Sequence, residues 1–313
     1  MRILKNLFMV KQEIKKKFVF IGETDSINIE LIAKSMKYLK NKVNYIVICN
    51  KDDLTKNKLL LKIDLNINEI IDPINFSDYK KGYLNLYNVE NLYDKKYLNL
   101  LNQLKISNNL ANLTKYDLVT MPINKATFKR HMKFTGMTEH LGILNKKNTA
   151  MLMYGDKFSI IPITTHINVK NIHKSIKSKY INSFLKNVLK NLKNVSETRF
   201  YDEINFLCYN PHCSEEGKLG QEDNIIRNII KNFKEIKGPI PADSAFIKIK
   251  KNTLFISTYH DQALIPFKII NKKCFNLTLG LNYRRLSPAH GTAKNIKNKY
   301  IADNTSYLTC LLF

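Results

Sequence analysis

Three histidines occupy equivalent places in the sequence, each just beyond an apolar run. His166 lies in "PITTHI", His212 in "YNPHCSEEG" and His260 in "TYHDQ". In open α/β sheets, ligands bind beyond the carboxyl ends of the strands. One histidine at such a place is usually only a polar cap, but three together favour a divalent metal, with coordination positions left open for a substrate. Asp261 could orient an imidazole from behind, and the histidines could come from different subunits.

The apolar runs before these histidines are typical of buried strands. Six such runs end in polar clusters, at residues 17–22, 44–49, 116–123, 158–165, 204–209 and 253–258. Residues 169–194 predict one amphipathic helix, since an apolar side chain recurs every fourth residue, at Ile172, Ile176, Tyr180, Phe184, Val188 and Leu192. Its lysines, Lys170, Lys174, Lys177 and Lys190, should face water. Strands alternating with helices predict an α/β fold with a mainly parallel sheet.

Composition limits the class of protein. With 313 residues, 44% of them hydrophobic, the chain can bury one large core or two lobes. Five cysteines without a C-x-x-C pair argue against a disulfide framework and for a cytoplasmic location. The start, "MRILKNLFMVKQEIKKK", is predicted to be a surface extension. No apolar stretch reaches the roughly 18 residues that a membrane span needs, so a soluble protein without a membrane partner is expected.

The net charge of +25 raises the question of nucleic acid. The lysines are spread along the whole chain, however, and no nucleic-acid-binding signature accompanies them. We therefore expect no nucleic-acid partner, whereas an anionic small substrate fits. The Lys- and Asn-rich tract at residues 51–115 keeps its apolar positions and is predicted to form helices and loops.

Seven motifs in order resemble one enzyme family. They are "MPINKATFKRHMKFTGMTEHLG", "TTHINVKNIHKSI", "NPHCSEEGKLGQED", "GPIPADSAF", "YHDQALIPFK", "NLTLGLNYRRLS" and "HGTA". Together they resemble the 4-hydroxythreonine-4-phosphate dehydrogenases of pyridoxal phosphate biosynthesis. The likeness covers residues 116–310 and is faint before them.

This resemblance implies a fold. The family has the two-lobed fold of the isocitrate and isopropylmalate dehydrogenases, with a cleft between two α/β lobes and a mainly parallel sheet. The expected lobes are residues 1–125 with 276–313, and residues 126–275, the latter carrying the metal and substrate site. The resemblance also implies a homodimer whose interface completes each active site.

It implies site residues as well. The metal ligands would be His166, His212 and His260, holding zinc, or else magnesium or cobalt. The substrate-binding positions correspond to Thr138, Lys268, Asn276, Arg285 and Met137, and Lys268, Asp243 and Asp261 would act as catalytic and supporting groups. His290, Gly291 and Thr292 would lie against NAD or NADP, although a plain glycine turn is the other interpretation there. No G-x-G-x-x-G motif is present, so a Rossmann nucleotide site is not expected.

The implied reaction accounts for these residue types. The family oxidises 4-phosphooxy-L-threonine with NAD(P)+, and the resulting β-keto acid loses carbon dioxide to leave 3-amino-2-oxopropyl phosphate. A bound metal would lower the pKa of the alcohol and polarise the new carbonyl. Lys268 and Arg285 would pair with the phosphate, the guanidinium through two parallel hydrogen bonds.

Three departures from the family pattern leave alternatives open. Met137 replaces a substrate-contacting histidine, Ala289 replaces an acid, and "GETDSINIE" (residues 22–30) carries Ser26 and Asn28 where the family has glycines. One alternative is a sister dehydrogenase acting on another four-carbon phosphorylated hydroxy acid or a diol. Another is a weakly active or non-catalytic dimeric descendant. His140 could partly replace the missing histidine, or be an ordinary surface histidine.

Overall fold

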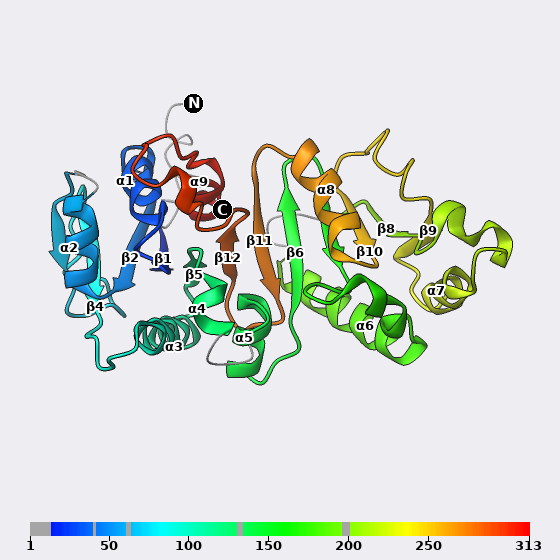
Figure 1. Cartoon of the computed structure of the whole chain (residues 1–313), viewed down its shortest axis with the longest axis horizontal. Coiled ribbons are helices and arrows are strands. Elements are labelled where there is room, and N and C mark those ends of the chain that lie inside the picture. Colours follow the sequence, from blue (N-terminus) through cyan, green and yellow to red (C-terminus); the bar gives the residue numbers. More distant parts are fainter. Residues whose placement is uncertain (1–13, 40–41, 61–63, 130–133, 196–200) are drawn as a thin grey trace, which may run out of the picture. The chain divides into compact units, whose positions relative to one another are not determined.

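The computed structural model describes residues 14–39, 42–60, 64–129, 134–195 and 201–313, which divide into two compact units (Figure 1). Unit 1 comprises the described parts of residues 1–121 and 292–313, and unit 2 those of residues 122–291. The expected lobes had placed residues 276–291 in the first lobe. In the structure these residues belong to unit 2, because β11 (Cys274–Leu279) pairs along its whole length with β6 (Ala150–Gly155).

Unit 1 is built on five parallel strands in the order β3-β4-β2-β1-β5. The strands are β1 (Lys15–Phe20), β2 (Val43–Cys49), β3 (Ile67–Glu69), β4 (Leu84–Asn88) and β5 (Asp117–Thr120). Helix α3 (Lys96–Thr114) packs against β1, β2 and β5, and α1 (Asn28–Leu39) packs against α2 (Lys51–Leu60) and α9 (Thr305–Leu312). Because parallel strands need cover on both faces, the central strands β1 and β2 are almost entirely buried.

The beginning of β1 corrects one expectation. The segment "MRILKNLFMVKQEIKKK" was predicted to be a surface extension, and its residues 1–13 lie outside the described residues, but Lys15 to Lys17 already belong to β1. Lys17 is completely buried and pairs with Asp117 at 2.9 Å. Its Nζ also donates to the carbonyl oxygen of Cys310 in α9, at 3.1 Å. A buried ammonium is tolerated only when paired in this way, so these contacts tie β1, β5 and α9 together.

The sheet of unit 2 has a parallel part and an antiparallel part. Its strand order is β12-β11-β6-β7-β10-β8-β9, in which β7, β10, β8 and β9 are parallel, whereas β12, β11 and β6 are antiparallel. The remaining strands are β7 (Ser159–Pro162), β8 (Glu203–Leu207), β9 (Ile236–Ile240), β10 (Thr253–Ser257) and β12 (Arg285–Pro288). All six strands predicted from the sequence are therefore confirmed, as β1, β2, β5, β7, β8 and β10.

The helices of unit 2 cover this sheet and enclose an aromatic core. The α-helices are α4 (Lys125–Lys129), α5 (Met137–Leu144), α6 (Ser178–Val195), α7 (Glu222–Ile230) and α8 (His260–Ile270). Two 3-10 helices, η1 (Val169–Ser175) and η2 (Pro211–Gly217), also belong to unit 2, whereas η3 (Lys294–Ile296) belongs to unit 1. α8 packs on β7 and β10. There Phe158 meets Phe255 and Phe267 edge-on, with ring centroids 5.4 and 5.7 Å apart. Such contacts fix the start of α8 at the end of β10.

The predicted single helix over residues 169–194 is wrong in two respects. The segment is split into η1 and α6, and Ile176 ends η1 with its N–H bonded to the carbonyl oxygen of His173. The buried stripe of α6 is Ile181, Leu185 and Val188, while Tyr180 is 45% exposed. Of the side chains predicted for the apolar face, Ile172, Ile176 and Val188 are buried, whereas Tyr180 is not, because the break changes the helical phase between η1 and α6. The lysines do face water, as predicted.

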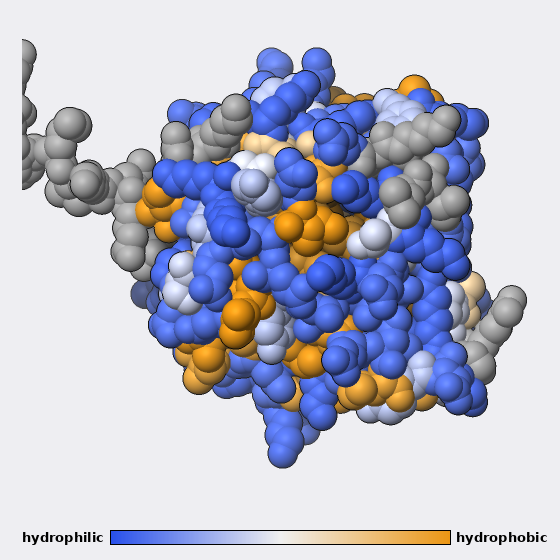
Figure 2. Space-filling model, turned by 90° about the vertical axis from the view of Figure 1, so that its left-hand side faces the viewer, coloured by the Kyte–Doolittle hydropathy of each residue, from blue (hydrophilic) through white to orange (hydrophobic). Residues whose placement is uncertain are grey.

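On the face shown in Figure 2, apolar side chains are scattered between hydrophilic ones. Of the helices that the structure describes, none combines the length and the apolar character needed to cross a membrane.

Candidate active site

The carboxyl ends of β7, β10 and β8 bring two of the three predicted histidines together. After β7 the chain continues beside the exit of β10: Ile163 N donates to the carbonyl oxygen of Ser257, and Thr164 donates to that of Thr258 from both N and Oγ1. This pairing carries His166 next to His260, with ring centroids 6.0 Å apart. Two imidazoles therefore lie together where this fold class binds ligands.

A carboxylate lies behind His166. Nδ1 of His166 is 3.5 Å from Glu139 Oε1, and Thr165 Oγ1 donates to the same oxygen at 2.7 Å. Burial alone would raise the pKa of Glu139, but the hydrogen bonds from His166 and Thr165 outweigh it and lower the pKa to about 2. Gly136 makes room for this pair, because a Cβ there would come within 2.4 Å of Glu139 Oε2 and 2.8 Å of the His166 ring.

His260 has a carboxylate of its own. Its Nδ1 is 2.7 Å from Asp261 Oδ1, as expected for an acid that orients the ring. Gln262 fixes the start of α8, since its Oε1 accepts from Thr258 N and its Nε2 donates to the carbonyl oxygen of Cys208 at the end of β8. The neighbouring strand ends are thereby locked to each other.

His212 lies in a strained loop after β8. Five consecutive non-glycine residues, His212 to Glu216, have φ between 43° and 67°, in the left-handed region. Each such residue costs roughly 1 kcal/mol, and such strain persists mainly at functional sites. The completely buried Asp223 holds the loop, because its carboxylate accepts from Tyr209 N at 2.7 Å, Asn210 N at 3.0 Å and Ser214 Oγ at 2.6 Å.

A disulfide also spans this loop. Cys208, directly after β8, is bonded to Cys213, with their Cα atoms 5.0 Å apart. The odd number of cysteines and the lack of a C-x-x-C pair argued against disulfides, and this pair is an exception to that expectation. The bond encloses His212, whose side chain is exposed.

The three histidines do not form a complete metal site within the described part of one chain. No group of three or more His, Cys, Asp or Glu side chains among the described residues is arranged to hold a metal ion. His166 and His260 are close, whereas His212 is presented separately by its own loop. The metal assignment thus stays a prediction, and so does the possibility, left open by the sequence, that the ligands come from different subunits.

Two of the predicted substrate residues, Asn276 and Arg285, lie on the antiparallel part of the sheet, and a third, Thr138, lies on α5 beside them. Arg285 on β12 is opposite Thr278 on β11, and its Nη1 is 3.1 Å from Thr278 Oγ1 and 3.4 Å from Thr138 Oγ1. Thr138 and Thr278 are themselves 3.3 Å apart. Asn276 precedes Thr278 by two residues and so points to the same face. Its Oδ1 is buried and has no hydrogen-bond partner among the described residues.

Lys268 and Asp243 are more exposed. Lys268 lies in the last turn of α8, close enough to Cys274 at the start of β11 to act on the pKa of that thiol. Asp243 is exposed in the segment after β9. Among the described residues, neither Lys268 nor Asp243 forms a hydrogen bond or ion pair with Thr138 or Arg285. The roles predicted for Lys268 and Asp243 therefore stay predictions.

Met137 and His140 lie on α5. Met137 begins the helix, and His140 packs against Phe134 with ring centroids 5.2 Å apart. Burial lowers the pKa of His140, so the imidazole is neutral near pH 7. A neutral ring packed against phenylalanine is a poor substitute for a charged phosphate ligand, and a half-buried ring is not an ordinary surface histidine either.

The predicted cofactor residues lie at the boundary between the units along the chain. His290 and Gly291 belong to unit 2 and Thr292 to unit 1. His290 Nδ1 is 2.9 Å from the carbonyl oxygen of Gly291, and nothing lies within 4 Å of the Cβ position of Gly291. Ala289, where the family has an acid, packs against the hydrophobic core of unit 2.

The altered amino-terminal loop is rebuilt with side-chain hydrogen bonds. Ser26 Oγ donates to the carbonyl oxygen of Glu23 at 2.5 Å, and Asn28 Nδ2 donates to the carbonyl oxygens of Ile21 and Glu23 at 2.9 and 3.1 Å. Neither residue has a positive φ, whereas Gly22 does, at 68°. Asp25 pairs with Lys294, at 3.1 Å, and with Lys297.

Sequence reasoning gave no role to four residues that organise these clusters. They are Glu139, Asp223, Gln262 and Thr278. All four lie inside quoted motifs, in "GMTEH", "GQED", "YHDQ" and "NLTLG". Their polarity inside motifs was a usable signal, but their partners are distant in sequence and only the fold shows them.

Comparison with known proteins agrees with this fold and these motifs. The family model described as Pyridoxal phosphate biosynthetic protein PdxA matches residues 41–313. A 4-hydroxythreonine-4-phosphate dehydrogenase of Sulfurihydrogenibium sp. (strain YO3AOP1) is 32% identical over 306 residues, covering 92% of this chain and 94% of that protein. An Oceanobacillus iheyensis protein is 27% identical over 94% of this chain and 95% of its own length. Its name provisionally assigns it D-threonate 4-phosphate dehydrogenase activity.

A solved structure gives the same result. The crystal structure of 4-hydroxythreonine-4-phosphate dehydrogenase from Klebsiella pneumoniae has a TM-score of 0.79 and 25% identity, covering 95% of this chain and 97% of that one. The family match spans most of the chain, and the site motifs fall inside it. The chain therefore belongs to the PdxA family of pyridoxal phosphate biosynthetic proteins.

Proposed function

We propose that this protein oxidises 4-phosphooxy-L-threonine (4-hydroxythreonine 4-phosphate) with NAD or NADP and releases carbon dioxide. The hydride of the C3–H bond passes to the nicotinamide, and the alcohol proton is lost, so C3 becomes a ketone. The resulting β-keto acid breaks its C2–carboxylate bond. Carbon dioxide leaves, and protonation of C2 gives 3-amino-2-oxopropyl phosphate. Full-length similarity to a dehydrogenase named for this substrate supports the proposal.

The observation that carries the proposal is the cluster around Arg285. The guanidinium is 3% exposed and already bonded to two hydroxyls, so its direction is fixed before substrate arrives. Preorganised guanidinium groups bind phosphate through two parallel hydrogen bonds. Asn276 adds a buried amide oxygen that needs a donor, which a substrate hydroxyl or ammonium would supply.

The chain's donors fit a divalent metal. His166 and His260 each direct Nδ1 at a carboxylate, as metal-binding histidines commonly do, which would leave Nε2 of each ring for a metal. We propose these two with His212 as the ligands, and zinc as the metal, with magnesium or cobalt as alternatives. A metal held by these residues would favour loss of the alcohol proton and would polarise the ketone.

The other residues receive roles from their positions. Asp261 orients His260, and Lys268 adds positive charge for the substrate phosphate or carboxylate. Asp243 would support the metal site from the segment after β9. His290, Gly291 and Thr292 would contact the nicotinamide cofactor, with Gly291 leaving space for it. We propose a homodimer, since His212 could then complete the site of a partner subunit, and a cytoplasmic location.

The central experiment measures NAD(P)H formation and zinc content together. His212→Ala should abolish turnover and lower zinc retention, whereas the zinc-free variant should melt with the zinc-free native protein, because the side chain is exposed. His173→Ala, another exposed histidine outside the proposed site, is the matched control. Full activity and unchanged zinc in His212→Ala would refute the metal assignment.

A second experiment tests the phosphate site. Arg285→Lys keeps the charge but loses the two-pronged hydrogen bonding, so KM for 4-phosphooxy-L-threonine should rise by roughly 10-fold or more. Arg284→Lys is the neighbouring control and should leave KM nearly unchanged. Similar KM values for all three proteins would contradict the assignment of Arg285.

Met137 favours a second candidate, the related dehydrogenation of D-threonate 4-phosphate. A thioether cannot pair with phosphate or donate a hydrogen bond, so one contact of the family pattern is missing. Both substrates should be compared by kcat/KM in the native protein and in Met137→His. If the histidine variant gains on 4-phosphooxy-L-threonine, the first function holds; a native preference for D-threonate 4-phosphate that the variant weakens would establish the second.

A further inference from the structure

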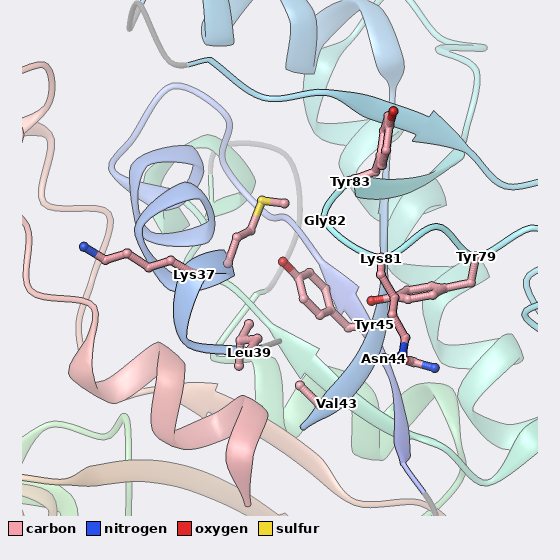
Figure 3. Close-up of a pocket in the computed structure, with 10 residues that line it drawn as sticks. Lys37, Leu39, Val43, Asn44, Tyr45, Tyr79, Lys81, Gly82 and Tyr83 are labelled. Atoms are coloured by element: carbon pink, nitrogen blue, oxygen red, sulfur yellow. The ribbon is translucent and has the colours of Figure 1, made fainter. Parts of the chain in front are cut away.

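A separate cavity of about 480 Å³ opens in unit 1 at the amino-terminal end of β2 (Figure 3). Its walls come from three segments: residues 36–39 at the end of α1, residues 43–45 at the start of β2, and residues 79–83 before β4. The loop with Ser26 and Asn28 follows the carboxyl end of β1, so this cavity lies at the opposite edge of the same parallel sheet. Its volume is typical of small-molecule sites.

Tyr45 is the unusual member of this cavity. The residue is only 5% exposed, and its hydroxyl has no hydrogen-bond partner among the described residues. In Figure 3 it lies between Leu39 and Tyr79, in the middle of the labelled side chains. Burial raises the pKa of Tyr45, so the hydroxyl stays protonated and can donate. A buried polar group without a partner is costly, and a ligand that bonds to it would remove that cost.

The other residues that line the cavity indicate which ring and which charge a ligand would carry. Tyr79 and Tyr83 offer aromatic rings, and Leu39 and Val43 offer apolar surface. Figure 3 shows Lys81 running beside Tyr79 toward Asn44, whereas Lys37 points away from Tyr45. Among the described residues that line the cavity, none is acidic. An aromatic ring with a negative group suits this combination, since rings pack on tyrosine and an ammonium attracts an anion.

We propose that this cavity binds a small aromatic carboxylate that also carries a polar ring substituent. The ring lies between the tyrosine and aliphatic walls, the Tyr45 hydroxyl bonds to the ring substituent, and Lys81 pairs with the carboxylate. No role assigned to the dehydrogenase site uses these residues. The proposal is therefore independent of the proposed reaction.

Fluorine NMR with three small probes tests each contact separately. 3-Fluoro-4-hydroxybenzoate has both polar groups, 3-fluorobenzoate lacks the hydroxyl, and 2-fluorophenol lacks the carboxylate. The first should bind the native protein most tightly, with saturable line broadening. Tyr45→Phe should weaken 3-fluoro-4-hydroxybenzoate about fivefold and leave 3-fluorobenzoate unchanged. Lys81→Ala should weaken both benzoates and spare 2-fluorophenol.

Two controls keep the result interpretable. Lys105→Ala removes an exposed lysine of unit 1 that does not line the cavity, and it should change no affinity. Tyr45→Phe should melt no lower than the native protein, because the hydroxyl it removes has no partner to lose. Absence of saturable binding, or affinities that neither variant changes, would overturn the proposal. A Tyr45→Phe variant that melts lower and loses all three probes alike would also overturn it, since that marks a purely structural tyrosine.

Discussion

Two loops that follow strands differ in the backbone conformation of their non-glycine residues. The loop after β1 in unit 1 has Ser26 and Asn28 at family glycine positions, and both adopt ordinary φ values and bond to nearby backbone. The loop after β8 in unit 2 keeps left-handed residues at five positions without using glycine for any of them. The substituted glycine positions of the first loop thus have ordinary backbone conformations, whereas the second loop keeps left-handed conformations at non-glycine residues as strain.

The strain in the loop after β8 indicates that its conformation, unlike that of the loop after β1, is fixed by surrounding contacts. Strain of roughly 1 kcal/mol per residue persists only when surrounding contacts outweigh it. In unit 2 those contacts are the Asp223 carboxylate and the Cys208–Cys213 bond, and the loop they hold presents His212. In unit 1 no histidine depends on the path, and the loop has adopted a relaxed one.

The largest expected effect comes from removing the group that holds the strained loop. Asp223→Ala would leave two backbone N–H groups and the Ser214 hydroxyl without their acceptor, so unfolding free energy should fall by about 3 kcal/mol or more. Chemical denaturation measures this. Asp202→Ala, an exposed aspartate, is the control. If both variants lose similar stability, Asp223 is not what holds the loop.

The relaxed loop should depend on the side chains that replaced glycine. Asn28→Gly removes two hydrogen bonds to backbone carbonyls and adds flexibility at the start of α1. We expect a loss of about 1 to 2 kcal/mol in the same denaturation experiment. A variant as stable as the native protein would show that the asparagine contacts contribute nothing.

Glycine should have the opposite effect in the strained loop. Glu216 is exposed with φ of 60°, a conformation that glycine adopts without steric cost, so Glu216→Gly should stabilise by about 0.5 to 1 kcal/mol. Glu235→Gly, at an exposed position outside the positive-φ set, should be neutral or destabilising. A loss of stability in Glu216→Gly equal to that control would remove the distinction between the loops.

The smallest effect concerns acid. Hydrogen bonds from Lys297 and Lys294 lower the pKa of Asp25 from 3.8 to about 2. Because the folded pKa lies below the unfolded one, the stabilisation is complete above about pH 4 and disappears as pH falls toward 2. The pair is partly exposed, so its contribution should stay below about 1 kcal/mol. Asp25→Asn should flatten the stability curve between pH 4 and 2; an unchanged slope would count against this pair.

The sequence predicted the buried strands because their signal is local. Runs such as "TLFIS" in β10 are apolar on both faces, which only a covered strand requires. The short β3 and the lysine-, glycine- and proline-containing β9 carry no such signal and exist because a neighbouring strand pairs with them. The break before α6 was likewise hidden, since a four-residue repeat cannot show a change of helical phase.

In the candidate site, too, some features could be predicted from local sequence and others depend on tertiary packing. Strand-end positions of the histidines could be read from apolar runs, and the motif resemblance named Thr138 and Arg285. That these two meet, although 147 residues apart, depends on the β11–β12 hairpin and on α5 packing beside it. The carboxylate behind His166 also depends on tertiary packing, because Glu139 precedes it by 27 residues and the two meet where Gly136, lacking a side chain, leaves room for them.

The burial of Lys17 against α9 has a consequence for how the chain is made. β1 leaves the ribosome well before α9, so its lysine finds the Cys310 carbonyl only after residues 292–312 have been synthesised. Unit 2 is continuous in sequence and does not wait for them. During translation, unit 2 should therefore become protease-resistant first, while the first strand of unit 1 lacks the α9 carbonyl that its buried charge requires until synthesis of α9 is complete.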